Sequence, residues 1–366
     1  MDGAFTLGIE EEFQLVDPGT RELKSHIEEM LAAGAHLGDQ IKPELHASVV
    51  EVGTPVCADI REARAAVKGL RKSLVEMAGA GGVRIVAAGT HPFSHWKDQE
   101  ITDRARYKDI VNEMEDLARA NLIFGLHVHV GIEDREMQIQ VMNGVRAFLP
   151  HLLALSVNSP FWCGRRTGVK SMRSTIFKRF PRTDIPDFYY SWSDYARYVE
   201  LLVKTNSIDD AKKIWWDVRP HAYFKTLEFR ICDIPCRAEE TIAIAALVQA
   251  LVVKLYRLFE SNLGVRSYPR AILAENKFRA LRTGLDGHMI DFGLKGEAPT
   301  RALVLEVLDF VDDCVSDLGS REELNLLRAW AASGDTGADR QLRTFEKTGD
   351  LRAVVDMLVD ETQVGL

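Results

Sequence analysis

The sequence lacks the features that would place it in a membrane or direct it across one. None of its apolar runs approaches the roughly 18 uninterrupted residues that a membrane-spanning helix needs. The N-terminal segment passes directly into a predicted strand, without the basic and apolar regions of a signal peptide. We therefore expect a cytoplasmic protein without a membrane partner.

The sequence also lacks an excess of positive charge, and it has few cysteines. Lys and Arg total 46 against 54 Asp and Glu, which gives a formal net charge of −8. Binding to nucleic acids or membrane surfaces depends on a positive field, so the charge favours small-molecule partners and argues against nucleic acid. The cysteines are odd in number, five, and scattered, which favours reduced thiols over a disulfide framework. Only Cys232 and Cys236 lie close together, and no second pair completes a zinc pattern.

Common catalytic and phosphate-binding motifs are missing as well. The chain contains no GxxxxGK[ST] loop, no GxGxxG after a strand, no GxSxG elbow and no HExxH. The nearest glycine-rich segment, 79–82, follows a predicted helix and precedes a strand, the reverse of what phosphate binding at a helix N-terminus requires. If the protein uses ATP, metal ions and arginines must hold the phosphates.

The order of apolar patterns predicts a mixed fold in one domain. Alternation of apolar and polar residues predicts strands over 5–16, 46–54 and 83–89. Helical spacing predicts one helix that is capped by Asp59 and Glu62 and a longer helix over 134–156. The predicted strands that carry candidate site residues are spread over more than two hundred positions of the chain, so we expect a single domain over 1–366. Its sheet-containing core would span 5–235, and a mainly helical part, 236–366, would pack on it. The apolar helix expected at 239–262 must be buried against something, which leaves a homo-oligomer open.

Three of the predicted strands carry pairs of polar residues two positions apart. Side chains alternate along a strand, so each pair shares one face. Any one pair could be the solvated face of an amphipathic strand. If the three strands share a sheet, however, the pairs converge on one surface and suit Mg²⁺ or Mn²⁺ and phosphate. The pairs are Glu10 and Glu12 in GIEEEF, His127 and His129 in GLHVHVG, and Glu228 and Arg230 in TLEFRICD.

Two further acids lie in the segment PELHASVVEVGTP. Glu51 falls in mid-strand among apolar neighbours, where an unpaired carboxylate is costly, so we expect a metal ion or an arginine as its partner. Glu44 lies seven positions earlier and would face the other way on an ideal strand, so it must come from the preceding turn or be an ordinary loop acid. His129 could be a ligand, a substrate contact or a core histidine.

The segment 164–182, GRRTGVKSMRSTIFKRFPR, holds seven Lys or Arg and no acid. In a chain of negative net charge, this local excess predicts an anion-binding loop, because guanidinium groups donate paired hydrogen bonds to phosphate or carboxylate. The alternative is a solvated surface loop.

Five segments together resemble the type 2 glutamate-cysteine ligase family of carboxylate-amine ligases, in order and in rough spacing. They are GIEEEF, PELHASVVEVGTP, GLHVHVG, NSPFWCGRRTGVKSMR and TLEFRICD. The resemblance implies an α+β fold like that of glutamine synthetase, with a curved, mainly antiparallel sheet lining the active-site cavity and helices on its outer face.

The resemblance also implies roles for individual residues. Glu10, Glu44 and Glu51 would hold one Mg²⁺ (or Mn²⁺), and Glu12, His127 and Glu228 another. Arg230 would face the transferred phosphate, and Arg173 would contact ATP or the acid, with Lys170 of the same loop also binding the nucleotide. The implied reaction is ATP-dependent: glutamate is activated as an acyl phosphate and joined to an amine such as cysteine. A metal-dependent phosphotransferase or phosphohydrolase, or a protein that only binds metal or nucleotide, are the alternatives.

Overall fold

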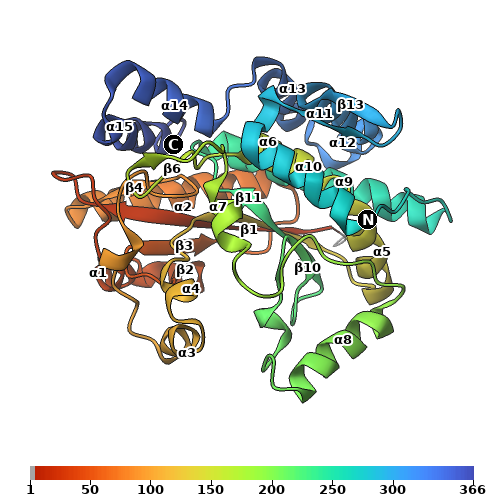
Figure 1. Ribbon diagram of the computed structural model, residues 1–366, viewed down its shortest axis with the longest axis horizontal. Coiled ribbons are helices and arrows are strands. Elements are labelled where there is room, and N and C mark those ends of the chain that lie inside the picture. Colours follow the sequence, from red (N-terminus) through yellow and green to blue (C-terminus); the bar gives the residue numbers. More distant parts are fainter. Residues whose placement is uncertain (1–4) are drawn as a thin grey trace.

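The computed structural model describes residues 5–366 and is built around a seven-stranded sheet (Figure 1). The strand order is β10-β11-β5-β1-β3-β2, β4 also pairs with β1, and all of these pairs are antiparallel. The expected strands at 5–16 and 46–54 are present as β1 and β3, and the strand expected over 83–89 is shorter. The sheet consists of β1 (Leu7–Val16), β2 (Ile41–Pro43), β3 (Val49–Gly53), β4 (Arg84–Val86), β5 (Gly125–Gly131), β10 (Val218–Pro220) and β11 (Thr226–Asp233).

Strand β1 lies in the centre of the sheet, and its register brings distant residues together. Glu12 is opposite Glu51 of β3, and Glu10 is opposite His127 of β5. On the far side of β5, Glu228 of β11 is opposite His129. The site-bearing segments are therefore neighbours across the strands.

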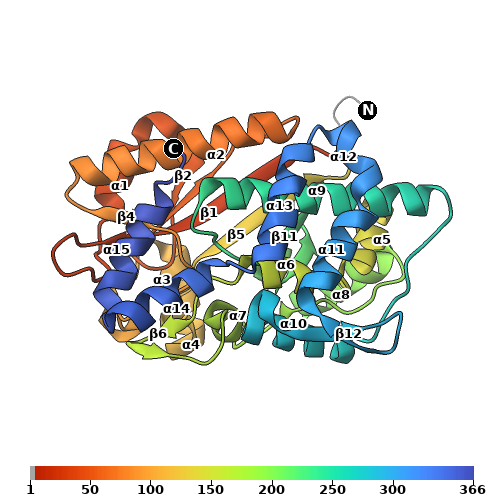
Figure 2. The same ribbon diagram turned by 90° about the horizontal axis from the view of Figure 1, so that it is seen from above.

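Helices α2 (Ile60–Ala80) and α9 (Ala238–Glu260) cover one face of the sheet and run across it in Figure 2. The expected cap is present, because Asp59 accepts hydrogen bonds from the backbone amides of Arg61 and Glu62. Helix α9 is long and apolar enough to cross a membrane, but 72% of its apolar window is buried inside the protein. Its partners include α2, α5, α13 and β5.

One buried ion pair joins this helical layer to the sheet. The Arg71 guanidinium of α2 donates to the carboxylate of Glu11, at 2.5 and 3.0 Å, and also to the carbonyls of Pro235 and Cys236. Because Glu11 alternates with Glu10 and Glu12, the flanking carboxylates point to the opposite face. The outer layer is thus fixed to the strand that carries the site.

The helix expected over 134–156 is two helices, α5 (Arg135–Val145) and α6 (Leu149–Ser156). Pro150 lies in the first turn of α6, where its missing N–H costs nothing, whereas inside one long helix it would remove a hydrogen bond. The expectation of one continuous helix was wrong for this reason.

The remaining segments are mostly helical. In Figure 1, α3, α4 and α8 project below the sheet, and the C-terminal helices lie above it. These elements are α1 (Ile27–Ala33), α3 (Ala105–Met114), α4 (Asp116–Arg119), α7 (Met172–Phe177), α8 (Trp192–Lys204), α10 (Arg270–Thr283), α11 (Thr300–Phe310), α12 (Asp312–Leu318), α13 (Arg321–Ser333), α14 (Gly337–Thr348) and α15 (Leu351–Thr362), with short strands β6 (Phe161–Trp162), β7 (Arg165–Arg166), β8 (Thr183–Asp184), β9 (Trp215–Trp216), β12 (His288–Asp291) and β13 (Gly296–Pro299).

Candidate active site

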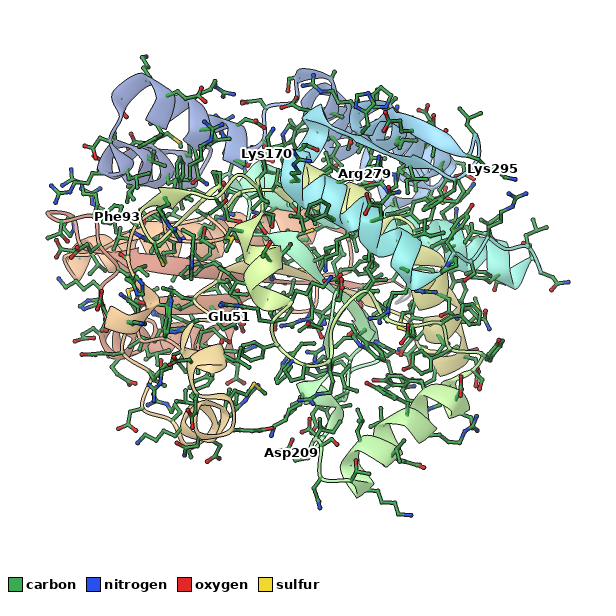
Figure 3. The ribbon with its side chains drawn as sticks, viewed as in Figure 1. Glu51, Phe93, Lys170, Asp209, Arg279 and Lys295 are labelled. Carbon is green, nitrogen blue, oxygen red and sulfur yellow. The ribbon has the colours of Figure 1, made fainter. Side chains whose placement is uncertain are left out.

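A cavity of about 450 Å³ lies on the sheet face opposite α2 and α9. Glu51, which is labelled in Figure 3, is one of the residues that line it. The strands supply its floor, and residues from α3, α7 and the β10–β11 connection supply its walls. Eight of the nine predicted site residues line it: Glu10, Glu12, Glu44, Glu51, His127, Arg173, Glu228 and Arg230.

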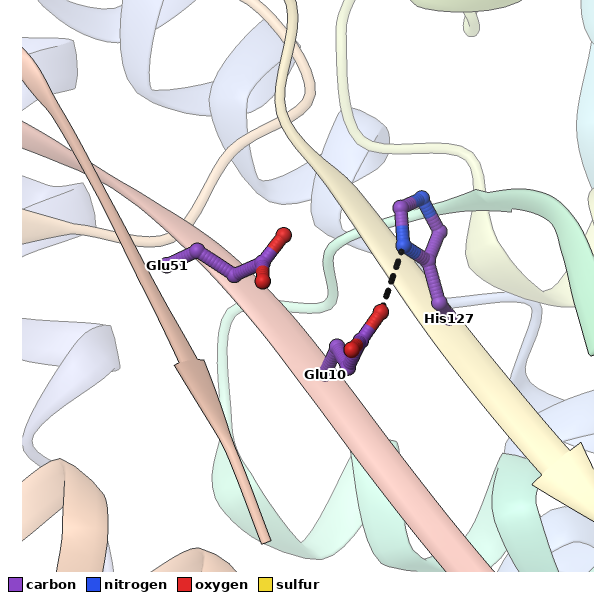
Figure 4. A group of neighbouring side chains, drawn as sticks. All are labelled: Glu10, Glu51 and His127. Atoms are coloured by element: carbon purple, nitrogen blue, oxygen red, sulfur yellow. Dashed lines mark hydrogen bonds and ion pairs between the residues drawn. The ribbon is translucent and has the colours of Figure 1, made fainter. Parts of the chain in front are cut away.

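The first group of potential metal ligands comprises Glu10, Glu51 and His127, whose ligand atoms lie within 4.8 Å of one another (Figure 4). His127 Nδ1 is 3.3 Å from a Glu10 carboxylate oxygen, and its buried Nε2 has no hydrogen-bond partner among residues 5–366. Burial, helped by the positive charge of Arg230, lowers the pKa of His127 to about 4. The imidazole is therefore neutral near pH 7, which is the form that binds metals.

Glu10 is ionised in this arrangement. Burial alone would raise the pKa of Glu10, but hydrogen bonds with His127 and His129 outweigh it and hold that pKa well below its ordinary value. Glu10 thus offers a carboxylate beside a neutral imidazole.

The second group comprises Glu12, Glu44 and Glu51, again within 4.8 Å. Burial raises the pKa of Glu12 to about 7, with a further contribution from the charge of Glu44. Burial and the charges of Glu10 and Glu44 raise the pKa of Glu51 well above its ordinary value. A divalent cation would remove this repulsion, and a donor set of carboxylates with one imidazole fits Mg²⁺ or Mn²⁺.

The side chains that lie close enough to share a cation are grouped differently from the two ligand sets that the resemblance implied. Glu10 groups with His127 rather than with Glu44, and Glu12 groups with Glu44 rather than with His127. Glu51 belongs to both groups. The reason is the register, which places Glu10 opposite His127 and Glu12 opposite Glu51. As expected, Glu44 comes from the turn that follows β2 and not from the strand of Glu51.

Glu228 lies in the cavity but belongs to neither group. Its carboxylate accepts hydrogen bonds from Arg219 Nε at 2.9 Å and Nη2 at 3.2 Å, and it is also paired with Arg230. Burial would raise the pKa of Glu228, but the charges of the two arginines outweigh it and keep that pKa well below its ordinary value. Arg219 was not predicted from the sequence, because only the sheet pairing reveals that it faces Glu228.

Arg173 and Arg230 lie next to each other in the lining of the cavity, and both pack against the ring of Phe177. Arg173 donates to the carbonyl of Arg230 at 3.1 Å. The Nε atoms of both side chains are buried and have no partner within the described part of the chain. They can therefore donate to an anionic ligand.

Asp233, which was not predicted from the sequence, holds the loop before α7, the helix that supplies Arg173. Its carboxylate accepts hydrogen bonds from the Ser159 hydroxyl at 2.6 Å, the Ser171 hydroxyl at 2.7 Å and the Asn158 amide at 2.9 Å. The Ser159 hydroxyl in turn accepts from the backbone amide of Arg173 at 3.1 Å. The end of β11 thus positions the loop that follows α6.

Lys170 does not join the other predicted residues. Its ammonium group is 2.7 Å from Asp286 and 2.5 Å from Asp339, and the side chain does not line the cavity. In Figure 3 it lies beside α10, away from Glu51. The prediction that Lys170 binds the nucleotide is inconsistent with this position, because two carboxylates already hold its charge.

Two further side chains in the cavity, Lys42 and His129, were not assigned a role from the sequence. Lys42 of β2 reaches Glu10 at 3.3 Å and Glu51 at 3.4 Å, so it neutralises part of the acidic cluster. His129, whose role was left open, lies in the cavity with Nε2 3.5 Å from Glu10 and Nδ1 3.2 Å from the Thr226 hydroxyl. The sequence offered no signal for Lys42 beyond its place beside Pro43.

Comparison with known proteins agrees with this geometry. Residues 6–357 match the model of glutamate-cysteine ligase family 2. Relatives named putative glutamate--cysteine ligase 2 are 56% identical in Solibacter usitatus (99% of this chain, 94% of the relative) and 56% identical in Sorangium cellulosum (100% and 98%).

Solved structures confirm the predicted fold. A glutamate--cysteine ligase from Francisella tularensis in complex with AMP superposes with a TM-score of 0.73 at 12% identity, covering 100% of this chain and 90% of that one. A bifunctional glutathione synthetase from Pasteurella multocida gives a TM-score of 0.70 at 15% identity, covering 98% and 52%. With the match over nearly its whole length, the chain belongs to glutamate-cysteine ligase family 2, and it is a ligase.

Proposed function

We propose that this ligase uses ATP and Mg²⁺, for which Mn²⁺ can substitute, to join the γ-carboxylate of glutamate to the nitrogen of an amine such as cysteine. The observation that carries the proposal is the pair of ligand groups that share Glu51 and adjoin Arg173 and Arg230. The names of the relatives support glutamate as the acid, and the AMP complex of the Francisella protein supports an adenine nucleotide.

The chemistry follows from these charges. The γ-phosphoryl group would pass from ATP to the glutamate carboxylate, leaving ADP and an acyl phosphate. The amine nitrogen would then attack the acyl carbon, so that a C–N bond forms, the C–O bond to phosphate breaks, and phosphate and one amine proton leave. Bound Mg²⁺ would neutralise charge on the phosphates.

The residues of the chain do the positioning. The Nε atoms of Arg173 and Arg230, which lack protein partners among residues 5–366, would donate to the oxygens on which negative charge increases. Glu228 holds Arg230 by an ion pair, which limits its freedom before the substrate arrives. Most of the rate enhancement would come from this fixed positive charge.

We also propose that the chain acts in the cytoplasm as one domain on small amino-acid substrates. Free cysteines support the compartment, since Cys57, Cys232, Cys236 and Cys314 are buried thiols without disulfide partners in the described residues.

The test is ADP release by the purified protein with Mg²⁺, measured over a matrix of acids and amines, with products identified by mass. ADP and an amide that both require glutamate and an amine support the proposal. ADP without an amide would instead identify a phosphotransferase or phosphohydrolase. Removal of Mg²⁺ with a chelator is expected to stop both products.

A further inference from the structure

Arg106 of α3 differs from the other arginines of the cavity. Four arginines line it: Arg106, Arg173, Arg219 and Arg230. Arg173 donates to backbone carbonyls, and Arg219 and Arg230 are paired with Glu228. Arg106 makes no hydrogen bond or ion pair with any residue between 5 and 366, and its side chain is exposed to the cavity. Its guanidinium is available to a ligand.

The wall beside Arg106 is apolar and aromatic. Tyr107, Phe180 and Leu45 are buried in one hydrophobic cluster, and Ile110 and Trp215 pack against it. The rings of Phe180 and Trp215 meet edge to face, with centroids 5.6 Å apart. All five residues line the cavity. A free guanidinium next to such a wall matches a ligand with a carboxylate and an apolar group.

The same end of the cavity also offers negative charge. Glu44 lies close enough for the charge of Arg106 to lower its pKa, although burial is the larger effect and raises it. Arg106 therefore lies beside the second group of potential metal ligands, so a carboxylate bound to it would lie near the metal ions. Arg106 and the apolar wall match the carboxylate and the side chain of an apolar α-amino acid.

The opposite end of the cavity has a different character. There, the ring of His221 stacks on Phe224, with centroids 4.6 Å apart, and Phe224 and Tyr223 remain 64% and 60% exposed. Lys212 lies over the Tyr223 ring. The cation at this open aromatic rim is the Lys212 ammonium, which cannot donate the paired hydrogen bonds that a guanidinium gives a carboxylate, so the Arg106 side suits an amino-acid carboxylate better.

We propose that the amine substrate is an α-amino acid with an aliphatic or aromatic side chain larger than that of cysteine, and that Arg106 and Ile110 select it. The carboxylate binds Arg106, and the side chain packs against Ile110, Phe180 and Trp215. The inference rests on the proposed function, whose amine partner it specifies.

The test compares amines that differ in one feature at a time. Leucine and alanine differ in apolar area, and each buried methylene contributes about fourfold in affinity, so we expect a KM for leucine at least tenfold below that for alanine. Leucine and 3-methylbutylamine differ only in the carboxylate. The wild type should prefer leucine to 3-methylbutylamine. Arg106→Gln should raise the KM for leucine at least tenfold and remove this preference. Arg106→Lys should retain part of the preference.

Matched variants separate recognition from folding. Lys108→Gln alters an exposed residue of the same helix, whose side chain pairs only with Asp103 among residues 5–366, and should leave all KM values unchanged. Ile110→Ala should reduce the preference for leucine over alanine without changing the KM for ATP. Thermal melting of each variant checks the fold.

The outcomes distinguish this inference from the proposed function. If an amide formed equally well with alanine, cysteine and leucine, the inference would be overturned but the proposed function would stand. The same conclusion would follow if Arg106→Gln raised the KM for ATP or glutamate and not the KM for leucine. Calorimetric titration of L-leucine into the wild type and Arg106→Gln gives a readout without turnover. Equal leucine binding by the two would overturn the inference even if no amide is ever detected.

Discussion

Glu12 and Glu51 face each other as partners in the antiparallel register of β1 and β3, on the cavity side of the sheet. Both carboxylates are buried enough that desolvation raises their pKa values. Glu44 joins them from the turn after β2. Three acids at this spacing destabilise the metal-free protein and favour binding of a divalent cation, which makes Glu51 the most informative ligand to change.

We predict that Glu51→Gln removes stabilisation by Mg²⁺. Thermal melting with and without Mg²⁺ should show an increase in Tm for the wild type and none for the variant, because Glu51 is the ligand common to both groups. The metal-free Tm should change little, since the repulsion from Glu10 and Glu44 and the ion pair with Lys42 are lost together. Activity should fall at least 100-fold. The control is Glu76→Gln, which changes an exposed residue of α2. If Mg²⁺ raised the Tm of Glu51→Gln as much as that of Glu76→Gln, the assignment of Glu51 as a ligand would be contradicted.

Two substitutions of Glu228 separate the loss of its negative charge from the loss of its hydrogen bonds to the arginines. Glu228→Ala leaves Arg219 and Arg230 buried without their common partner, which costs about 3–5 kcal/mol in typical buried ion pairs. Glu228→Gln keeps an oxygen that can accept a hydrogen bond and should cost less. Both variants should lose activity. Chemical denaturation should rank the stabilities as wild type, Gln, Ala, and an Ala variant as stable as the wild type would contradict the role of the two arginines.

The local part of the site could be predicted from the sequence, and the long-range part could not. Alternation along a single strand depends only on neighbouring residues, so Glu10 with Glu12, and Glu228 with Arg230, were correctly placed on the cavity side. The grouping of Glu10 with His127 depends on the register of strands more than a hundred residues apart.

Lys170 also shows that a local sequence pattern cannot reveal contacts with distant residues. Its basic neighbours suggested an anion site, but its partners Asp286 and Asp339 lie 116 and 169 positions away in the chain. No local pattern contains that information. By contrast, the cap at Asp59 needs only the next three residues and was predicted correctly.

Gly125 provides a test of Arg173 that leaves the arginine itself intact. A Cβ at this position would overlap the guanidinium of Arg173, coming within 2.9 Å of its Cζ. Because the guanidinium is the flexible end of a long side chain, Gly125→Ala should displace it at little cost in stability. We expect kcat/KM to fall about 10- to 100-fold with a nearly unchanged Tm. Gly69→Ala, in α2 with open space around it, should keep full activity. Full activity in Gly125→Ala would contradict a role for Arg173.

His91 predicts how stability depends on pH, away from the metal ligands. The ring is fully buried: Nε2 donates to the Arg21 carbonyl at 2.9 Å, and Nδ1 accepts from the amides of Ser94 at 2.8 Å and Phe93 at 3.2 Å. Protonation of Nδ1 would break both of the latter bonds. Burial lowers the pKa of His91 to about 3.

Because the unfolded chain binds a proton at His91 near its ordinary pKa of about 6.5 and the folded chain does not, acid favours unfolding. The contribution of His91 to the free energy of unfolding is complete above pH 6.5 and declines as the pH falls toward 3, by about 2 kcal/mol between pH 7.5 and 5. Denaturant titrations at these two pH values should show a smaller decline for His91→Asn than for the wild type, whatever the variant's stability at pH 7.5. His36→Asn, which replaces an exposed histidine, should follow the wild type. Equal declines in His91→Asn and the wild type would show that folding does not lower the pKa of His91.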